Sequence, residues 1–162
     1  MGMLVPFVVT KHSVVSIGDD DDETTVLLLK AAEVNVPMTI SSYEGECIVY
    51  LLTDGDLDPC SAASVLKGVL ALSDIPVVKI VITELCDDGD DPESQFASML
   101  FLKKGDEEVS FPIFPSDAIL LALALGAPMF IDEEVVMRAT EGEDAQRFLS
   151  VVEETAHVAL ES

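Results

Sequence analysis

The sequence predicts a single-domain α+β fold, in which helices pack against a mixed, mainly antiparallel sheet. Segments typical of strands and of helices are interleaved along the chain, and short turns between strands indicate antiparallel hairpins. No linker or internal repeat marks a second domain, and 162 residues suit one domain with a substantial core. A hydrophobic content of 49% excludes a disordered chain.

The first half of the chain is predicted to form strands and then two helices. Strand-like segments occupy residues 4–9, 14–17, 24–30 and 36–40. Ser41 and Glu44 form an S-x-x-E capping box, which predicts a helix over residues 42–53. A second helix is predicted over residues 59–72, with Asp58 as its N-cap and an apolar side.

The middle of the chain predicts further strands. An apolar strand over residues 76–85 is followed by an acidic loop over residues 87–93. Residues 95–103 and 107–113 then form a hairpin around a turn that contains Gly105.

A helix over residues 115–125 is the most clearly delimited element. Pro115-Ser116-Asp117 supplies an oxygen-bearing cap and an anion at the positive helix end. Because residues 118–125 are all apolar, no face suits water and the leucines and isoleucine should be buried. Gly126 can end the helix in a left-handed conformation. A short strand over residues 129–131 follows.

The C-terminal part is predicted to be helical. Asp132 caps a short helix that ends near Arg138, and Gly142 marks a break. We assign residues 1–140 to the domain and residues 141–162 to a C-terminal amphipathic helix. The apolar stripe of this helix must be covered, either by the same domain or by a partner subunit in a homo-oligomer.

The charge restricts the partners. With 31 acids against 8 bases, the formal net charge is -23, which repels phosphate backbones and disfavours nucleic acid as a partner. A salt-rich cytoplasm of a halophile would screen this repulsion, since the Debye length is about 3 Å at 1 M salt. An acidic mesophilic protein fits the composition equally well.

Nothing in the sequence indicates a membrane or an oxidising compartment. No apolar run reaches the roughly 18 residues of a membrane span, and no basic region precedes the first apolar residues, so we expect a cytoplasmic protein. Cys47, Cys60 and Cys86 show no C-x-x-C spacing, and their odd number argues against a disulfide framework.

Common catalytic and binding motifs are missing. A calcium loop beginning at Asp54 fails, because Pro59 and Val65 stand where glycine and glutamate are required. The sequence contains neither a phosphate-binding glycine loop nor a G-x-S-x-G or H-E-x-x-H motif. His12 and His157 have no motif around them, so a Cys–His nucleophilic pair rests on residue types alone.

Two acidic helix starts remain as candidate sites. Glu44 and Glu46 lie in the first turns of one helix, while Ser116 and Asp117 open another. If the two N-termini converge, their carboxylates could hold a divalent ion, which metal-assisted phosphodiester cleavage requires. The alternative is that these residues only cap their own helices.

Two segments of the chain resemble one known family. The downstream segment contains Pro115-Ser116-Asp117-Ala118, Leu121-Ala122-Leu123, Gly126-Ala127-Pro128 and Phe130. The upstream segment contains Val36-Pro37-Met38-Thr39-Ile40, Glu44-Gly45-Glu46 and an apolar helix through Leu52. These segments and their spacing are similar to the bifunctional nuclease family (DUF151), and the resemblance covers the domain of residues 1–140.

The resemblance implies a nuclease, a hydrolase that cleaves DNA and RNA phosphodiester bonds with the help of a divalent metal such as Mg²⁺ or Mn²⁺. The site residues would then be Glu44, Glu46 and Asp117 as metal ligands or bases, with Glu44 and Asp117 holding the metal. Ser116 would orient the reacting groups.

The sequence also departs from the family's pattern. The family usually has arginine before Pro-Ser-Asp, where this chain has Phe114, and residues 59–63 lack the His-Asp pair of the family's second helix. The alternative is therefore a non-catalytic scaffold or protein-interaction domain with a degenerate site. The two hypotheses differ in whether Glu44 and Asp117 share an open cleft or only bond to their own helix amides.

Overall fold

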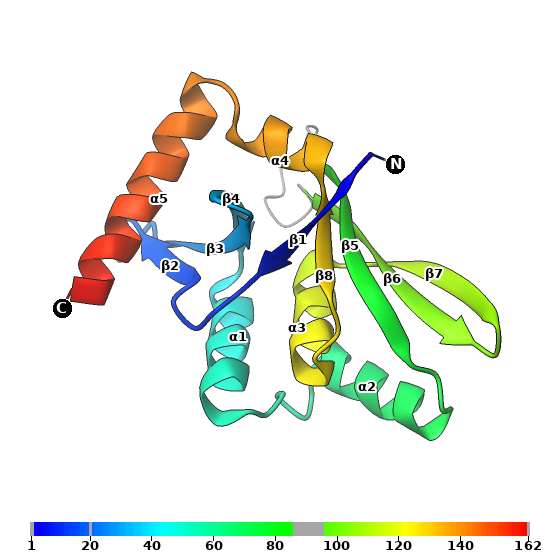
Figure 1. Cartoon of the computed structure of the whole chain (residues 1–162). Coiled ribbons are helices and arrows are strands. Elements are labelled where there is room, and N and C mark those ends of the chain that lie inside the picture. The colour runs from blue at the N-terminus through cyan, green and yellow to red at the C-terminus, as the bar shows by residue number, and fades with distance from the viewer. Residues whose placement is uncertain (1, 20, 86–95, 162) are drawn as a thin grey trace.

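The computed structural model describes residues 2–19, 21–85 and 96–161 (Figure 1). The strands are β1 Leu4–Val8, β2 Val14–Ile17, β3 Thr24–Ala31, β4 Val34–Ile40, β5 Val77–Leu85, β6 Phe96–Lys104, β7 Glu107–Ile113 and β8 Met129–Asp132. The helices are α1 Ser42–Asp54, α2 Ala62–Leu72, α3 Pro115–Leu125, α4 Glu133–Thr140 and α5 Glu143–Glu161. None of the helices in these ranges is long and apolar enough to cross a membrane.

The described strands form one curled, mixed sheet. Its order is β2-β3-β1-β8-β5-β6-β7, and β4 pairs with β3. The pairing of β5 with β8 is parallel and the other pairings are antiparallel, so the predicted α+β class with a mainly antiparallel sheet is confirmed. The predicted hairpin forms between β6 and β7, while Cys86 and the acidic loop over residues 87–93 lie outside the described residues.

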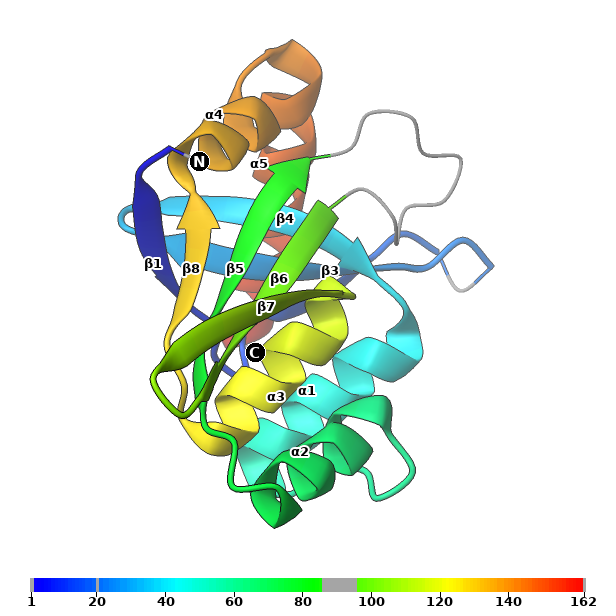
Figure 2. The same cartoon turned by 90° about the vertical axis from the view of Figure 1, so that its right-hand side faces the viewer.

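Strand β1 joins the two halves of the sheet. Its first residues pair with β8, from Leu4 opposite Asp132, and its last residues pair with β3, where Phe7 lies opposite Ala31. Because one short strand serves both neighbours, β3 and β4 run across the direction of β5 and β8 (Figure 2). The concave side that results holds α1 and α3.

Strand β3 is buried on both faces. Leu27 and Leu29 pack into the main core with α1 and α3, whereas Val26 and Leu28 pack against Leu149 and the neighbouring apolar residues of α5. Successive side chains point to opposite faces of a strand, which explains why β3 is apolar throughout instead of alternating. Helix α5 therefore covers the outer face of the sheet at β2 and β4 (Figure 1).

Helix α3 is buried along its first two turns only. Ile119 and Leu121 are fully buried between the sheet and helices α1 and α2. The expectation that all its leucines are buried is wrong at the C-terminal end, where Leu123 is half-buried and Leu125 is 42% exposed. The last turn extends past the elements that cover the helix before Gly126 ends it at a φ of 68°.

Helix α2 begins later than predicted. Ser61, not Asp58, is its N-cap and accepts a hydrogen bond from the Ser64 amide at 3.1 Å. Asp58 instead accepts hydrogen bonds from the Cys60 amide at 3.0 Å and from the Tyr43 hydroxyl, which places it in an Asx turn. On the apolar side of this helix, Leu70 is buried, while Val65, Val69 and Leu72 are exposed.

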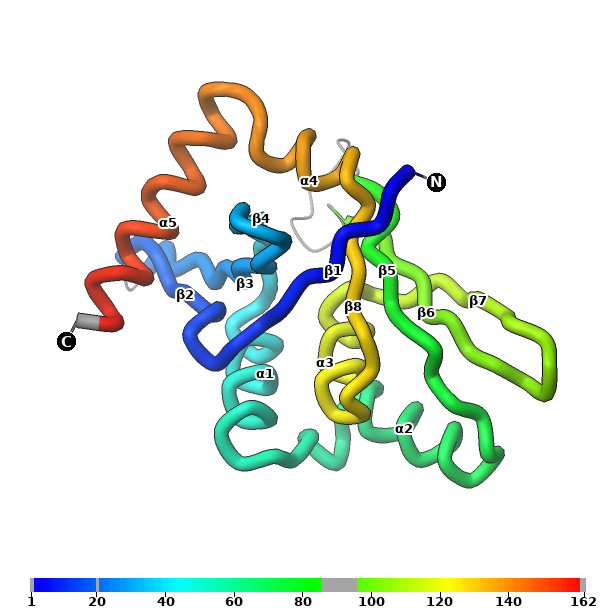
Figure 3. The backbone as a smooth tube through the Cα atoms, viewed as in Figure 1, coloured from blue at the N-terminus to red at the C-terminus, as the bar shows by residue number. Residues whose placement is uncertain are grey.

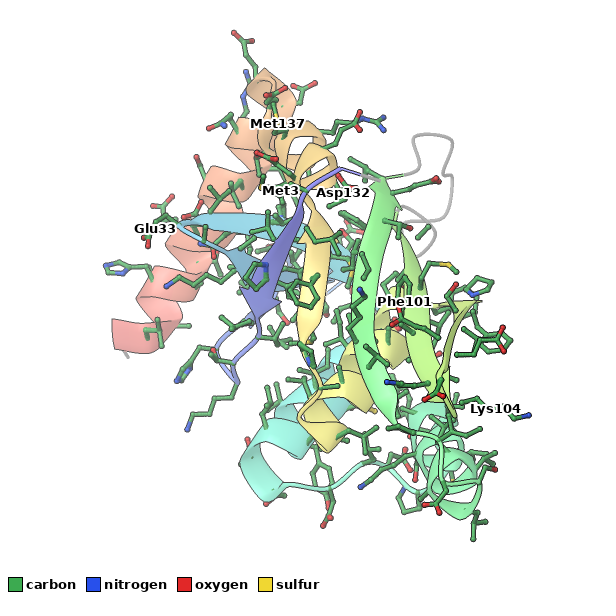
Figure 4. All side chains as sticks on the ribbon, turned by 45° about the vertical axis from the view of Figure 1, so that its right-hand side comes forward. Met3, Glu33, Phe101, Lys104, Asp132 and Met137 are labelled. Carbon is green, nitrogen blue, oxygen red and sulfur yellow. The ribbon has the colours of Figure 1, made fainter. Side chains whose placement is uncertain are left out.

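Asp132 caps α4 as predicted and also binds the N-terminal segment through a hydrogen bond. Its carboxylate accepts hydrogen bonds from the amides of Glu134 at 2.9 Å and Gly2 at 3.0 Å. The amide of Glu133 donates to the Met3 carbonyl, and Figure 4 shows Met3 beside Asp132. The buried carboxylate thus satisfies donors from two chain segments.

We expect Leu121→Ala to lower the free energy of unfolding by about 2–5 kcal/mol, because it opens a cavity in a fully buried position. The matched control is Leu125→Ala, four residues along the same helix, which should change stability by less than about 1 kcal/mol. Urea denaturation followed by circular dichroism measures both. Equal losses in the two variants would contradict the partial burial of α3.

Candidate functional site

Glu44 is fixed at the start of α1 by a complete capping box. The Ser41 amide donates to Glu44 Oε1 at 2.9 Å, and the Glu44 amide donates to Ser41 Oγ at 3.1 Å. The predicted capping box is therefore confirmed. Gly45 lets the helix approach the sheet, since a Cβ there would lie 2.9 Å from Thr25 Cγ2. Close packing thus sets the position of the carboxylate.

The start of α3 differs from the predicted arrangement. Phe114 is the N-cap, with an extended ψ of 136° and no side-chain hydrogen bond, so Ser116 and Asp117 do not cap this helix. Pro115 has the fixed φ and the missing N–H that suit the first helical position, which moves the following two residues into the first turn. Asp117 is nevertheless an anion at the positive end of the helix, as expected.

The two helix starts meet at one pocket. Each helix directly follows a strand, α1 after β4 and α3 after β7, as the backbone trace shows (Figure 3). Helices α1 and α3 contact each other along the concave side of the sheet. Between their first turns lies a pocket of about 100 Å³, lined by residues 38–40 at the end of β4, by Glu44, and by residues 114–117.

Asp117 is electrostatically strained in this pocket. Partial burial raises the pKa of its carboxyl above the ordinary value, and the negative charge of Glu44 raises it further. The positive end of α3 would by itself lower this pKa, so it acts against burial and repulsion. Perturbed acids in a pocket are frequent at functional sites, because such sites need groups whose charge is not fully compensated.

The structure brings Glu44, Ser116 and Asp117 around one pocket but places Glu46 elsewhere. Glu46 is exposed and lines a second groove of about 590 Å³ between α1 and strands β2 and β3. Two residues along a helix correspond to a rotation of about 200°, so Glu44 and Glu46 cannot face the same pocket. Ser116 is 6% exposed and lies at the pocket wall.

Glu44 and Asp117 are the two residues of this pocket that could hold a divalent cation. Magnesium usually binds to one or two protein carboxylates and keeps water or substrate oxygens as its other ligands, and two carboxylates are what this pocket offers. Within the described ranges, no group of three or more His, Cys, Asp or Glu residues could hold a metal. A tightly held zinc site with four protein ligands therefore does not fit this pocket.

Other candidate nucleophiles lie apart from the pocket. Cys47 is buried within α1, where burial raises the pKa of its thiol and disfavours the reactive thiolate. Cys60 is exposed in the loop before α2. His12 lies in the turn between β1 and β2, and His157 lies on α5, so neither lines the pocket.

Sequence reasoning missed part of the pocket wall. Residues 38–40, at the end of β4, line the pocket, although the sequence predicts only a strand there. Phe114 also lines it, although the sequence marks this position only as one where the family usually has arginine. One sequence signal indicates that Phe114 lies at the pocket. It directly precedes Pro115, a residue type that often occupies the first position of a helix, and the N-cap residue borders the first turn.

The protein is a curled α+β domain in which two helix N-termini place carboxylates at one pocket. The model of the bifunctional nuclease domain matches residues 26–143, and the chain belongs to this family. The match spans β3 to the first residue of α5 and so includes the whole pocket. No curated protein matches the chain.

We expect Asp117→Asn to stabilise the protein at pH 7. The folded-state pKa of Asp117 is raised, so between the unfolded and folded pKa values the native state binds more protons and stability falls as pH rises. Asparagine at this position cannot ionise, so the variant does not lose stability in this way as pH rises. Its melting temperature should therefore exceed that of the unsubstituted protein at pH 7, and the difference should shrink as pH falls towards the ordinary pKa of aspartate.

Asp58→Asn is the matched control, because the pKa of Asp58 is shifted in the opposite direction to that of Asp117. The Tyr43 hydroxyl, together with the Cys60 amide, lowers the pKa of Asp58, so its ionised form stabilises the folded state above the ordinary pKa. This variant should melt at a lower temperature than the unsubstituted protein at pH 7. Thermal denaturation in which both variants lose stability equally would show that Asp117 is not strained.

Proposed function

We propose that this protein is a metal-assisted nuclease whose site is the pocket between the first turns of α1 and α3. Glu44 and Asp117 hold a divalent cation, Mg²⁺ or Mn²⁺, and Ser116 orients the groups bound there. The observation that carries the proposal is the convergence of Glu44 and Asp117, from distant parts of the sequence, on one open pocket. Membership of the bifunctional nuclease domain family supports the same chemistry.

Each residue has a defined task in this proposal. A cation held by Glu44 and Asp117 would offset the repulsion that raises the pKa of Asp117. Amides in the first turn of α3 lack partners within their helix and can donate to a phosphate oxygen. The cation, when bound, neutralises phosphate charge and activates water. Glu46 takes no part, because it lines the other groove.

The net charge of -23 sets the conditions for activity. None of the residues that line the pocket is lysine or arginine, so the protein offers no cation of its own to attract phosphate there. Added salt screens the repulsion between enzyme and substrate, since the Debye length falls from about 10 Å at 0.1 M to about 3 Å at 1 M. Activity should therefore be weak at low salt and rise with salt.

A second candidate function is a non-catalytic scaffold or protein-interaction domain. The observation that favours it is the capping box, because one oxygen of Glu44 already accepts a hydrogen bond from its own helix start. In the part of the chain that the structure describes, no hydrogen bond joins the Asp117 carboxylate to the start of α3, so the two carboxylates differ in this respect. Cation binding discriminates the two functions, since a scaffold needs no cation.

Hydrolysis of labelled DNA and RNA, with Mg²⁺ or Mn²⁺ and with EDTA, tests the proposal across a series of KCl concentrations. We expect cleavage that needs the divalent ion and falls in Asp117→Asn and Glu44→Gln by at least about 10–100-fold, the loss typical even of outer-shell partners. Glutamine still serves a capping box, so Glu44→Gln removes charge without removing the cap.

Glu46→Gln is the matched control, because it removes one carboxylate from the same helix turn outside the pocket. Its activity should equal that of the unsubstituted protein, and circular dichroism verifies that all three variants fold. Robust cleavage in EDTA that both pocket substitutions leave intact would overturn the proposed site. Absence of both cleavage and cation binding would favour the scaffold.

A further inference from the structure

Phe114 is a large apolar side chain held in solvent beside the carboxylate pocket. It is 70% exposed although it belongs to the wall of the pocket that contains Glu44 and Asp117. A proline follows it, which restricts its backbone to the extended conformation that is observed, with φ of -62° and ψ of 136°. The ring is therefore attached to a defined backbone position between β7 and α3.

The same ring also lines a second, apolar groove. This groove of about 380 Å³ lies between the start of β6 and the end of β7, and it includes Phe96, Ile113 and Pro115. Its volume is within the range of about 300–1,000 Å³ of small-molecule pockets. Among the residues that the structure describes, none that lines it is charged, in a chain whose net charge is -23. Phe114 and Pro115 line both hollows, so the apolar groove adjoins the carboxylate pocket.

We propose that Phe114 and the adjoining groove bind an unpaired nucleobase, so that the substrate is single-stranded nucleic acid. This inference rests on the proposed function for the position of the cleaved phosphate, but the binding of the base does not depend on catalysis.

Base stacking favours this occupant over a duplex, although the net charge of -23 repels the backbones of both. Binding to a duplex relies on lysine and arginine that displace counterions, and neither hollow is lined by such a residue. Stacking of a base on an aromatic ring adds affinity that does not depend on the charge of the backbone, and it is tolerant of sequence. A base inside a duplex has both faces covered, and its extrusion costs a few kcal/mol, so an exposed ring selects unpaired bases.

The arrangement also connects binding with cleavage. A base stacked on Phe114 would lie beside the pocket that Glu44 and Asp117 line, because Phe114 lines both hollows. Stacking then supplies the affinity that the negative surface removes, and it holds the phosphodiester beside the carboxylates.

The experiment uses the absence of tryptophan from the chain. Phe114→Trp introduces a single indole at the proposed stacking position. Phe111→Trp, the matched control, places the same fluorophore three residues earlier, at another exposed phenylalanine that lines neither hollow. Both variants are titrated in EDTA and about 1 M KCl with a single-stranded oligonucleotide and with its duplex.

We expect the single strand to quench the emission of Phe114→Trp, the duplex to leave it unchanged, and Phe111→Trp to respond to neither. In fluorescence anisotropy with a labelled single strand, Phe114→Ala should weaken binding about 5- to 150-fold, as the loss of one stacked base predicts. Phe111→Ala should bind like the unsubstituted protein.

Several results would overturn the inference. These are equal quenching by duplex and single strand, equal quenching of both tryptophan variants, or unchanged binding in Phe114→Ala. Emission of Phe114→Trp that shifts with protein concentration, without oligonucleotide, would show that a second copy of the chain covers the ring instead. Specific quenching without metal-dependent cleavage would uphold base binding and reject the nuclease function.

Discussion

The burial of the first two turns of α3 is the constraint on which the rest of the structure depends. These turns have no charged residue after Asp117 and lie in the concavity of the sheet against α1 and α2. A helix that is apolar on every side gains stability only when it is covered on every side. The sheet must therefore curl around it, and β1 allows this by pairing with β8 at one end and with β3 at the other.

The same burial creates the candidate site. It brings the start of α3 to the start of α1, whose approach to the sheet is permitted by Gly45. Asp117 is then forced into a partly buried position near a second carboxylate, where its charge is costly. The apolar core offsets this cost, which is a common way for a fold to keep a strained functional group. The same geometry leaves Phe114 in solvent, because the core begins only with the next residue.

Local signals made most elements predictable. The capping box of Ser41 and Glu44, the left-handed Gly126 and the Asp132 cap depend on neighbouring residues, so the sequence contains what determines them. Burial was less predictable, since Leu72 and Leu125 are apolar yet exposed. Their exposure depends on where the covering elements end, which is a tertiary property that periodicity does not encode.

The candidate site was predictable only in part, because it too depends on tertiary arrangement. The meeting of two helix starts follows from helix packing, and its residues could be proposed because both starts carry acids. Glu46 was grouped with Glu44 by sequence proximity, although a helix turns them to different sides. Ser61 caps α2 instead of Asp58, whose carboxylate accepts a hydrogen bond from the Tyr43 hydroxyl, 15 residues away in the sequence.

The central claim is that Glu44 and Asp117 act on each other across one pocket. An NMR titration of the Asp117 carboxyl in the unsubstituted protein and in Glu44→Gln tests it most directly. The account predicts a pKa above the ordinary 3.8 that falls when Glu44 is neutralised and falls again when Mg²⁺ is added. A pKa in the ordinary range that neither the substitution nor Mg²⁺ changes would contradict it.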